Sequence, residues 1–209
     1  MSGIYIHIPY CKKACHYCNF HFSTNQNSKT SFIKAVCKEL QLRSSEYGSQ
    51  EIQTIYFGGG TPTVLEVSEL TSILDVVYEV YNVSPAPEIT LEANPDDLDL
   101  EKIIALSKTK INRLSIGIQS FHETDLLAMN RAHNADEAKK CLEIATKYFD
   151  NITIDLMFGM PTMSADHWRQ NLQTAFGFGI KHLSCYAMTV EPQTALEHFI
   201  KKGRDSLLF

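Results

Sequence analysis

The chain has 209 residues, the length of one large domain, and carries 19 Lys and Arg against 24 Asp and Glu, a net charge of −5. Its 44% hydrophobic and 21% charged residues exclude disordered and fibrous classes. Without a dense Lys/Arg block, such a chain is a poor partner for nucleic acid. No apolar run is long enough to span a membrane, and no basic segment precedes the first apolar run, so we expect a cytoplasmic protein.

Six short apolar runs, rich in β-branched residues, recur along the chain and predict β-strands. None of them shows a strict alternation of polar and apolar residues, which is typical of parallel strands covered on both faces. In chain order they are residues 3–8, 53–57, 88–92, 113–118, 151–157 and 182–188.

Helical patterns lie between these runs, and several begin at a capping residue. Between residues 67 and 81, apolar side chains recur with the helical period. The capping candidates are Asp99 before residues 100–107, the Asn134–Glu137 pair before residues 136–149, and Ser164 before a helix that ends at Phe176, ahead of Gly177 and Gly179.

Strand and helix alternate six times, which predicts an α/β fold built from right-handed βα units. A closed barrel of eight such units usually takes about 250 residues, so we predict a partial, open (βα)6 barrel of the TIM type, with residues 1–209 as one domain. The sequence ends at residues 201–209, inside or just after the expected sixth helix, and we expect a C-terminal domain to be absent or truncated. In such barrels, functional residues follow the C-terminal ends of the strands.

The loop after the first predicted strand holds three cysteines, Cys11, Cys15 and Cys18, within eight residues. Thiolates select zinc, copper or iron–sulfur clusters. A closed zinc site needs four ligands, and His16 or His21 could supply the fourth. On a four-iron cluster, three thiolates instead leave one iron open to a substrate or a cofactor.

The other cysteines and the lysines of this loop are interpreted without a functional role. Cys37, Cys141 and Cys185 stand singly in apolar segments, which is typical of small buried hydrophobic residues. Lys12 and Lys13 lie between the first two loop cysteines and are interpreted as a solvated face.

The pattern CxxxCxxC in the loop after the first strand of a βα-barrel resembles the signature of the radical S-adenosylmethionine (SAM) superfamily. The resemblance implies that Cys11, Cys15 and Cys18 hold a [4Fe–4S] cluster whose open iron is chelated by SAM. It also implies that reduction of the cluster cleaves SAM homolytically to methionine and a 5′-deoxyadenosyl radical.

Three glycines, Gly58, Gly59 and Gly60, follow the second strand directly. Because they lack a side chain, the backbone can approach a ligand closely, and its carbonyl groups can accept hydrogen bonds from the methionyl ammonium group of SAM. The alternative is a tight turn with Pro62 at the first helical position. One glycine would serve for a turn, so the run of three favours a ligand.

Polar residues also lie at or after the ends of later strands. Glu92 can accept hydrogen bonds from ribose hydroxyls, or it is a loop acid in water. Asp155 interrupts an apolar run. Because burial of an unpaired charge costs several kcal/mol, this carboxylate needs a basic side chain or a ligand as its partner. Arg131 offers a guanidinium group for bidentate pairing with a carboxylate. Ala187 either packs on adenine or belongs to the core.

Six segments together resemble the coproporphyrinogen III oxidase-like branch of the superfamily, which contains the oxygen-independent coproporphyrinogen III dehydrogenases and the HemW-type haem chaperones. They are YIHIPYCKKACHYC, YFGGGTPT, LEANP, RLSIGIQSF, MNRAHNADEA and DLMFGMP. The resemblance assigns no catalytic residue. It implies SAM contacts at Tyr5, Tyr17, Gly59, Gly60, Thr61, Glu92, Gln119, Arg131, Asp155 and Ala187.

Two features favour the haem chaperones within this branch. Phe20 stands where the dehydrogenases carry a fourth cysteine, two residues after the third. The first strand begins by Ile4, without the N-terminal segment that helps to enclose the porphyrinogen in the dehydrogenases. The haem-binding motif of full-length chaperones belongs to their C-terminal domain and has no counterpart in this sequence.

We therefore expect a radical SAM [4Fe–4S] protein of porphyrin or haem metabolism that binds haem and passes it to an acceptor protein, and that takes electrons from a donor. The first alternative is a coproporphyrinogen III dehydrogenase, an oxidoreductase that decarboxylates propionate side chains to vinyl groups and forms protoporphyrinogen IX. The second is a non-catalytic module that binds zinc or an iron–sulfur cluster. The dehydrogenase hypothesis makes the protein an enzyme, whereas the other two hypotheses do not require it to be one.

Overall fold

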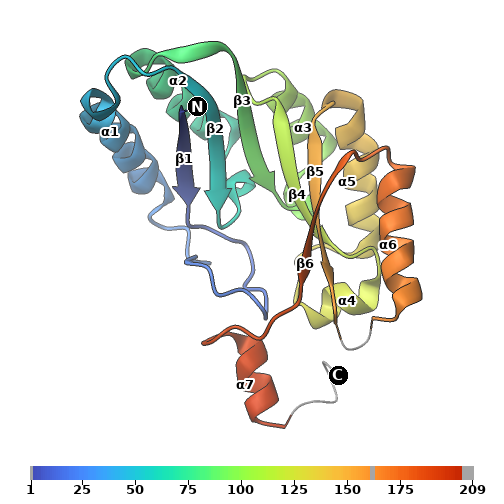
Figure 1. The fold of residues 1–209 in the computed structure, drawn as a ribbon. Helices are drawn as coiled ribbons and strands as arrows, with labels where there is room; N and C mark the ends of the chain where they lie inside the picture. The colour runs from blue at the N-terminus through green and yellow to red at the C-terminus, as the bar shows by residue number, and fades with distance from the viewer. Residues whose placement is uncertain (1, 161–162, 204–209) are drawn as a thin grey trace.

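The computed structural model describes residues 2–160 and 163–203, in which six parallel strands form one curved sheet (Figure 1). The strands lie in chain order across the sheet, and in the described part of the chain the first and last strands do not pair. The predicted open (βα)6 barrel is therefore confirmed. The strands are β1 (Ser2–Ile8), β2 (Ile52–Gly59), β3 (Val83–Ala93), β4 (Arg113–Gln119), β5 (Ile152–Phe158) and β6 (His182–Ala187).

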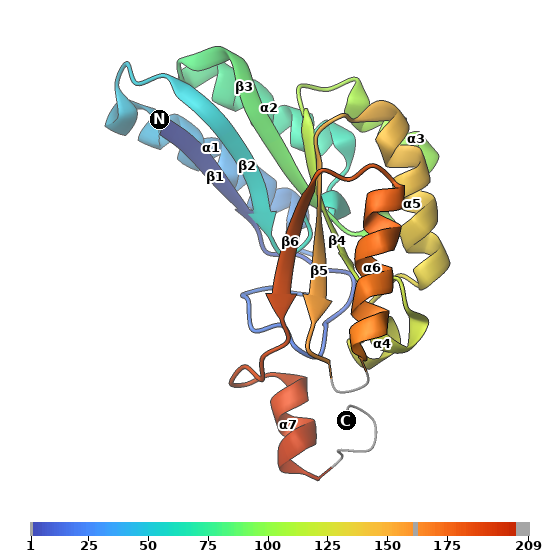
Figure 2. The same ribbon diagram turned by 45° about the vertical axis from the view of Figure 1, so that its right-hand side comes forward.

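Helices cover the outer, convex face of the sheet, whereas its inner, concave face carries no helix of the described chain (Figures 1 and 2). Two short 3-10 turns, η1 (Pro62–Val64) and η2 (Pro95–Asp97), follow β2 and β3. The helices are α1 (Lys29–Tyr47), α2 (Val67–Val80), α3 (Leu100–Ser107), α4 (Glu123–Ala128), α5 (Ala135–Tyr148), α6 (Ala165–Gly177) and α7 (Ala195–Lys201).

The structure confirms the predicted strands and the predicted helix caps, with one large difference in length. β3 begins at Val83, five residues before the predicted start, because Pro85 and Pro87 interrupt the apolar pattern there and the pairing register shifts. The caps are Asp99, which accepts from the Lys102 amide at 2.8 Å, the reciprocal Asn134–Glu137 capping box, and Ser164, which accepts from the His167 amide at 3.1 Å.

The main hydrophobic core lies between the convex face of the sheet and the helices. Phe57 of β2 and Leu91 of β3 are fully buried there, and α2 adds Ile73 and Val77 from the apolar stripe that its period predicted. Burial of each such side chain contributes about 1.5–3 kcal/mol. The core therefore holds the strands in place from the convex face and leaves the concave face of the sheet open.

A smaller cluster at the C-terminal end of the barrel supports the cysteine loop. Leu126 of α4 and Met129 pack with Met157 at the end of β5 and with Met160. The ring of Tyr17, which belongs to the cysteine loop, packs against this cluster. The loop is thus seated on α4, a helix that the sequence analysis did not delimit.

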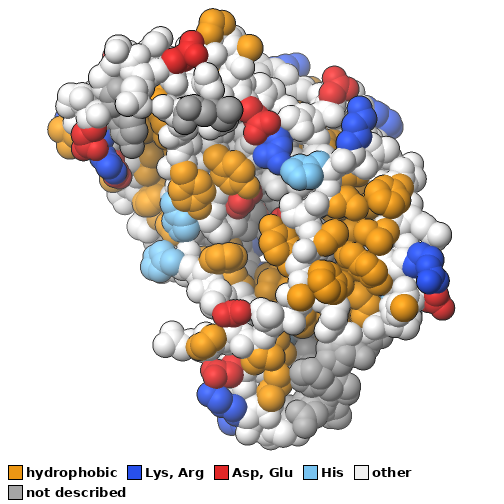
Figure 3. Space-filling model, viewed as in Figure 1, with side chains coloured by type: hydrophobic (Ala, Val, Ile, Leu, Met, Phe, Trp, Pro, Cys, Tyr) orange, Lys and Arg blue, Asp and Glu red, His pale blue; other side chains and the backbone are white. Residues whose placement is uncertain are grey.

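The prediction that every strand is covered on both faces is wrong for the two edge strands. Tyr5 of β1 is 58% exposed and Tyr186 of β6 is 55% exposed. The reason is that the inner face of an open barrel meets solvent, which hydrophobic periodicity alone does not reveal. Figure 3 shows hydrophobic side chains gathered on the surface over β5, β6 and α6.

The scattered cysteines differ in burial for the same reason. Cys141 on α5 is buried, as predicted, but Cys37 on α1 is half-buried and Cys185 on β6 is exposed. The prediction of a buried residue is therefore wrong for Cys185, because β6 is an edge strand with one side open.

The helix of the sixth unit, α7, lies below the C-terminal ends of the strands and not on the convex face (Figure 1). The Leu196 amide donates to the His16 carbonyl at 2.8 Å, so α7 contacts the cysteine loop. Of the predicted terminal segment 201–209, residues 204–209 lie outside the described residues. No helix in the described ranges combines the length and hydropathy that a membrane span requires.

Candidate cofactor site

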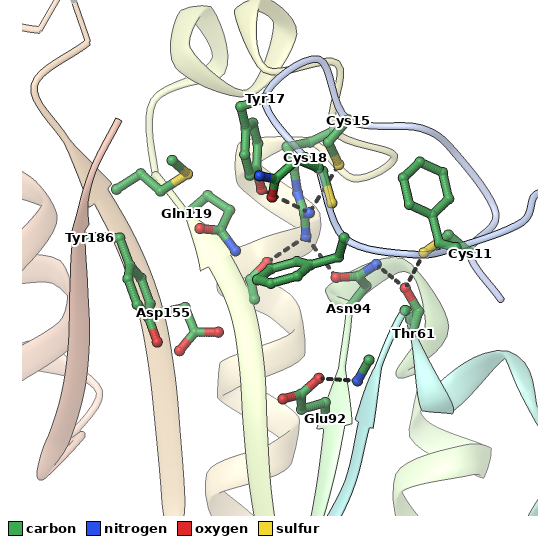
Figure 4. Close-up of a pocket in the computed structure, with 18 of the residues that line it drawn as sticks. Cys11, Cys15, Tyr17, Cys18, Thr61, Glu92, Asn94, Gln119, Asp155 and Tyr186 are labelled. Carbon is green, nitrogen blue, oxygen red and sulfur yellow. Dashed lines mark hydrogen bonds between the residues drawn. The ribbon is translucent and has the colours of Figure 1, made fainter. Parts of the chain in front are cut away.

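A cavity of about 420 Å³ opens at the C-terminal ends of the strands, where the surface is hollowed (Figures 3 and 4). Its walls come from the cysteine loop, the glycine run at the end of β2 and the ends of β3 to β6. This volume is within the range of small-molecule sites. The predicted site residues that line it are Cys11, Cys15, Tyr17, Cys18, Gly59, Gly60, Thr61, Glu92, Gln119, Arg131, Asp155 and Ala187.

The cysteine loop is closed at its base and tied at its tip. The Cys11 amide donates to the Ser23 carbonyl at 3.0 Å, and the Ser23 amide donates to the Pro9 carbonyl at 2.8 Å. At the tip, the Asn130 side chain donates to the Ala14 carbonyl at 2.7 Å. Asn130 has a φ of 58°, a left-handed conformation that Asn adopts more readily than most residues.

The two lysines of this loop are exposed, as expected of a solvated face, but both also anchor the loop to other parts of the protein. Lys12 forms ion pairs with Asp97 and, at 3.3 Å, with Asp96, although its side chain is 48% exposed. Because Asp97 is buried, the cation offsets the desolvation of its carboxylate. Lys13 donates to the Arg131 carbonyl at 3.1 Å. These contacts tie the loop to the β3–α3 connection and to the segment after α4.

The three loop thiols face one common space (Figure 4). Burial raises the pKa of Cys11, and the Cys18 and Cys15 thiolates raise it further. Burial likewise raises the pKa of Cys18, with a contribution from Cys15. Both shifts favour the neutral thiols, so the cysteines would become thiolates together only beside a cation such as iron.

The Arg131 guanidinium lies directly beneath these thiols and is held by the protein. One terminal nitrogen donates to Cys15 Sγ at 3.3 Å and to the Tyr17 hydroxyl at 3.4 Å. The other donates to Asn94 Oδ1 at 2.6 Å and to the Gly117 carbonyl at 2.7 Å. Its partners thus include no carboxylate, in contrast to the predicted bidentate pair, while its Nε is buried without a partner in the described chain.

Asn94 is a site residue that the sequence analysis missed. It follows β3 in the LEANP segment, and its side chain lines the cavity between Arg131 and Thr61. Asn94 Nδ2 donates to Thr61 Oγ1 at 3.1 Å, and the Thr61 hydroxyl donates to Cys11 Sγ at 3.5 Å. The available signal was its place two residues after Glu92, where a strand end meets the functional edge of the barrel.

The structure changes the reason for the glycine run. Gly59 has a φ of 110°, and a Cβ there would overlap the His7 imidazole ring. A Cβ on Gly60 would lie 2.6 Å from the Tyr10 carbonyl oxygen. The glycines therefore admit groups of the protein itself, a reason that neither the predicted ligand nor the alternative of a tight turn had included. Gly59 and Gly60 also line the cavity, and η1 begins at Pro62, so the turn and the cavity share this segment.

Glu92 is bonded within the protein and is not a loop acid in water. Its two oxygens accept from the Tyr56 hydroxyl at 2.7 Å and from the Gly59 amide at 3.1 Å. Burial raises the pKa of its carboxyl group, and these two hydrogen bonds oppose the shift. Tyr5 does not line the cavity, and its exposed ring stacks on that of Tyr56 with a centroid distance of 6.0 Å.

Two polar side chains across the cavity from the thiols lack strong partners (Figure 4). Gln119 is only 8% exposed, and within the described residues no group is hydrogen-bonded to its side-chain amide. Asp155 accepts from the Ser184 hydroxyl, and burial, followed by the charge of Glu92, raises its pKa to about 6. Ala187 is exposed at the cavity edge and is not core. Buried polar groups normally have partners, so this side is suited to a polar ligand.

The zinc alternative with His16 does not fit this geometry. His16 Nδ1 is hydrogen-bonded to the Ala128 carbonyl at 3.1 Å, and the ring packs edge-on against Phe199. Among the described residues, the cavity is lined by no histidine and no fourth cysteine, and no three His, Cys, Asp or Glu side chains surround a single metal position. Three thiols spread round one cavity are a donor set that fits an iron–sulfur cluster.

An open barrel of six βα units with three cysteines in its first loop defines a class of proteins, and comparison with known sequences identifies it. The radical SAM superfamily profile matches residues 5–175. The chain belongs to the radical SAM superfamily.

Within this superfamily, the chain is similar to proteins named "Heme chaperone HemW". It is 35% identical to that of Bacillus subtilis (strain 168) over 207 residues, covering 98% of this chain and 55% of the relative. It is 32% identical to that of Escherichia coli (strain K12), covering 92% of this chain and 52% of the relative. The chain thus spans about half the length of these relatives.

Solved structures share the fold. Coproporphyrinogen III oxidase (HemN) from Escherichia coli superimposes with a TM-score of 0.82 at 22% identity, covering 98% of this chain and 52% of the other. The radical SAM methyltransferase TsrM from Kitasatospora setae, described with cobalamin and a [4Fe-4S] cluster bound, superimposes with a TM-score of 0.68 at 12% identity, covering 96% and 39%. At these identities, the likeness supports the fold alone.

Proposed function

We propose that this protein is a radical SAM protein of porphyrin or haem metabolism, and in particular a haem chaperone that binds haem and transfers it to an acceptor protein. In this proposal residues 1–209 form the radical SAM core domain, which works in the cytoplasm with an electron donor. The support for haem comes from the names of the relatives, about half of whose length the chain matches.

One observation carries the cofactor part of the proposal. Cys11, Cys15 and Cys18 line one cavity, whose lining in the described part of the chain includes no fourth cysteine and no histidine. Three thiolates would hold a [4Fe–4S] cluster at three irons and leave the fourth open toward the cavity. When bound, the cluster and SAM supply one-electron cleavage of a carbon–sulfur bond.

The rest of the cavity offers groups that match the parts of SAM. Glu92 and Asp155 are hydrogen-bond acceptors suited to ribose hydroxyls, and Gln119 presents an amide that is free to bond a ligand. Ala187 leaves room at the exposed edge, where an adenine ring would pack. Arg131 is placed to hold the thiolates from below and to contribute positive charge beside an anionic cluster.

The cofactor proposal is tested by anaerobic reconstitution of the chain with iron and sulfide. We expect a [4Fe–4S]⁺ EPR signal after reduction, and a change in that signal when SAM is added. The matched control is Cys37→Ala, which removes a thiol on α1 outside the cavity and should reconstitute like the wild type. An EPR signal that does not respond to SAM would contradict an open iron and favour a non-catalytic module.

The haem proposal needs separate measurements. Haem titrated into the reconstituted native gene product is expected to bind with a shift of the Soret band, and to pass to an apo haem protein added in excess. Incubation with coproporphyrinogen III, SAM and a reductant is expected to give no vinyl product. Vinyl formation would overturn the chaperone proposal in favour of the dehydrogenase. Phe20 at the cavity, where the dehydrogenases have a cysteine, argues against that outcome.

A further inference from the structure

We propose that Asn94 is a positioning residue that directs hydrogen bonds onto the cluster thiolates and thereby sets the reduction potential of the cluster. Asn94 is hydrogen-bonded to Thr61 and Arg131, and it would act on the cysteines through these two residues. The proposal rests on the proposed function, because it requires a cluster on Cys11 and Cys15.

The direction of the hydrogen bonds follows from the chemistry of the groups. A guanidinium group only donates, so the Asn94 atom that lies 2.6 Å from Arg131 must be the amide oxygen. The amide nitrogen therefore faces Thr61 Oγ1, at 3.1 Å, and donates to it. A threonine hydroxyl has a single hydrogen, and because its oxygen already accepts from Asn94, that hydrogen is free to point at Cys11 Sγ, 3.5 Å away.

The same guanidinium serves a second thiol. Arg131 donates to Cys15 Sγ at 3.3 Å through the terminal nitrogen that does not contact Asn94. Asn94 and the Gly117 carbonyl hold the other nitrogen, at 2.6 and 2.7 Å, and so fix the plane of the guanidinium group. The side-chain amide of Asn94 thus contacts both Thr61, which donates to Cys11, and Arg131, which donates to Cys15.

Gly117 makes this arrangement possible. A Cβ at this position would lie 3.2 Å from Asn94 Oδ1 and 3.3 Å from the Arg131 nitrogen, and 3.0 Å from Gln119 Nε2. A Cβ there would crowd both groups, which would have to shift by a few tenths of an ångström. The backbone amide of Asn94, which donates to Thr63 Oγ1 at 3.4 Å, holds the residue from the other side.

The consequence concerns the electron that the cluster accepts. Hydrogen bonds to cluster sulfurs are among the factors that set the potential, because they stabilise the more negative, reduced state. If Asn94 is removed, Thr61 can turn its hydrogen away from Cys11, and Arg131 loses the contact that orients it toward Cys15. The reduced cluster is then less stabilised, and the potential becomes more negative.

The test is the midpoint potential of the reconstituted cluster, followed by the EPR signal during a redox titration. Asn94→Leu removes the amide at similar volume and without a charge, and Thr61→Val removes one hydroxyl at nearly constant shape. Both variants are expected to retain cluster iron and sulfide and to shift the potential to more negative values. In the double variant, the shift is expected to be smaller than the sum of the two, because Asn94 acts partly through Thr61.

The controls are the same substitutions outside the cavity. They are Asn151→Leu before β5, at the opposite end of the barrel, and Thr174→Val on α6, and both are expected to keep the wild-type potential. If Asn94→Leu fails to take up a cluster, the midpoint potential of Thr61→Val alone tests the proposal. Wild-type potentials in cluster-loaded Asn94→Leu and Thr61→Val would overturn this proposal and leave the proposed function intact. A wild-type chain that assembles no cluster would overturn both.

Discussion

The two sides of the cavity, one formed by the cysteine loop and the other by the ends of β4 and β5, differ in their hydrogen bonding. The polar side chains on the first side are bonded to one another, whereas those on the second side have few partners within the part of the protein that the structure describes. On the cysteine side, Arg131, Asn94 and Thr61 form a connected network that ends on two thiols, and Lys12 ties the loop to buried Asp97. On the β4–β5 side, Gln119 has no side-chain bond among the described residues, and no cation pairs with Asp155 there.

This difference separates two tasks. A side that holds a metal cluster has to keep three thiols in place, so its polar groups are bonded to one another. A side that binds a small molecule keeps polar groups whose partners arrive with the ligand, at a cost in stability. Four substitutions test this division.

The largest effect is expected for Cys15→Ala. Two remaining thiolates cannot hold a four-iron cluster, so iron and sulfide content should fall close to zero, while Arg131 loses one of its acceptors. Colorimetric iron and sulfide assays after reconstitution measure this. The paired control is Cys141→Ala, in the core of α5, which should cost stability and leave the cluster in place. A normal cluster in Cys15→Ala would mean that another residue completes the site.

Gly59→Val is expected to destabilise the fold itself. The positive φ of Gly59 disfavours a β-branched residue, and the side chain would overlap the His7 ring. We expect a loss of about 3 kcal/mol or more in the free energy of unfolding. The comparison is Gly159→Val, which also has a positive φ but open space around it, with an expected loss of about 1–2 kcal/mol. Equal losses in urea titrations would show that the contact with His7 does not matter.

Lys12→Met should loosen the cysteine loop. The variant leaves the buried carboxylate of Asp97 without its cation, and we expect a loss of about 1–2 kcal/mol together with slower uptake of iron. The cause would be the higher entropy of the loop before the cluster binds. Lys140→Met, at an exposed position of α5, is the control and should change neither quantity. Reconstitution kinetics at the wild-type rate would refute an anchoring role.

Asp155→Asn, the last of the four, should stabilise the protein when no ligand is bound. The pKa of Asp155 is raised from 3.8 to about 6, so the folded state favours the protonated form, and this stabilising contribution is present below about pH 4 and lost as pH rises through 6. The Asn variant keeps it, and should be more stable above pH 6 by about 1–2 kcal/mol after allowance for partial exposure.

Unfolding titrations at pH 4, 6 and 7.5 (roughly the range in which such a carboxyl group titrates) check this prediction. The two proteins should be about equally stable at the lowest pH and diverge as pH rises. SAM should bind the variant more weakly. If wild type and variant differ by the same amount at every pH, Asp155 is not a strained group awaiting a ligand.

The sequence of this protein predicts its helices and strands well and its side-chain contacts poorly. Strand positions, helix caps and the cysteine loop depend on residues near one another in the chain, and the sequence predicts them. The ion pair of Lys12 with Asp97 joins residues 85 positions apart, and the bond of Asn94 to Thr61 joins two loops. No local pattern encodes such pairs. The reason for the glycine at position 59, a close approach of His7, was missed for the same reason.

The sequence by itself determined the βα alternation, the open barrel and the three closely spaced thiols, because hydrophobic periodicity, capping and cysteine spacing are local properties. Only the tertiary structure decided which polar groups end up bonded and which remain available to a ligand. Edge strands left Tyr5 and Tyr186 exposed, and Asn94 became the link between two thiol donors. These outcomes depend on how distant loops meet at the mouth of the barrel, where burial makes every polar group need a partner.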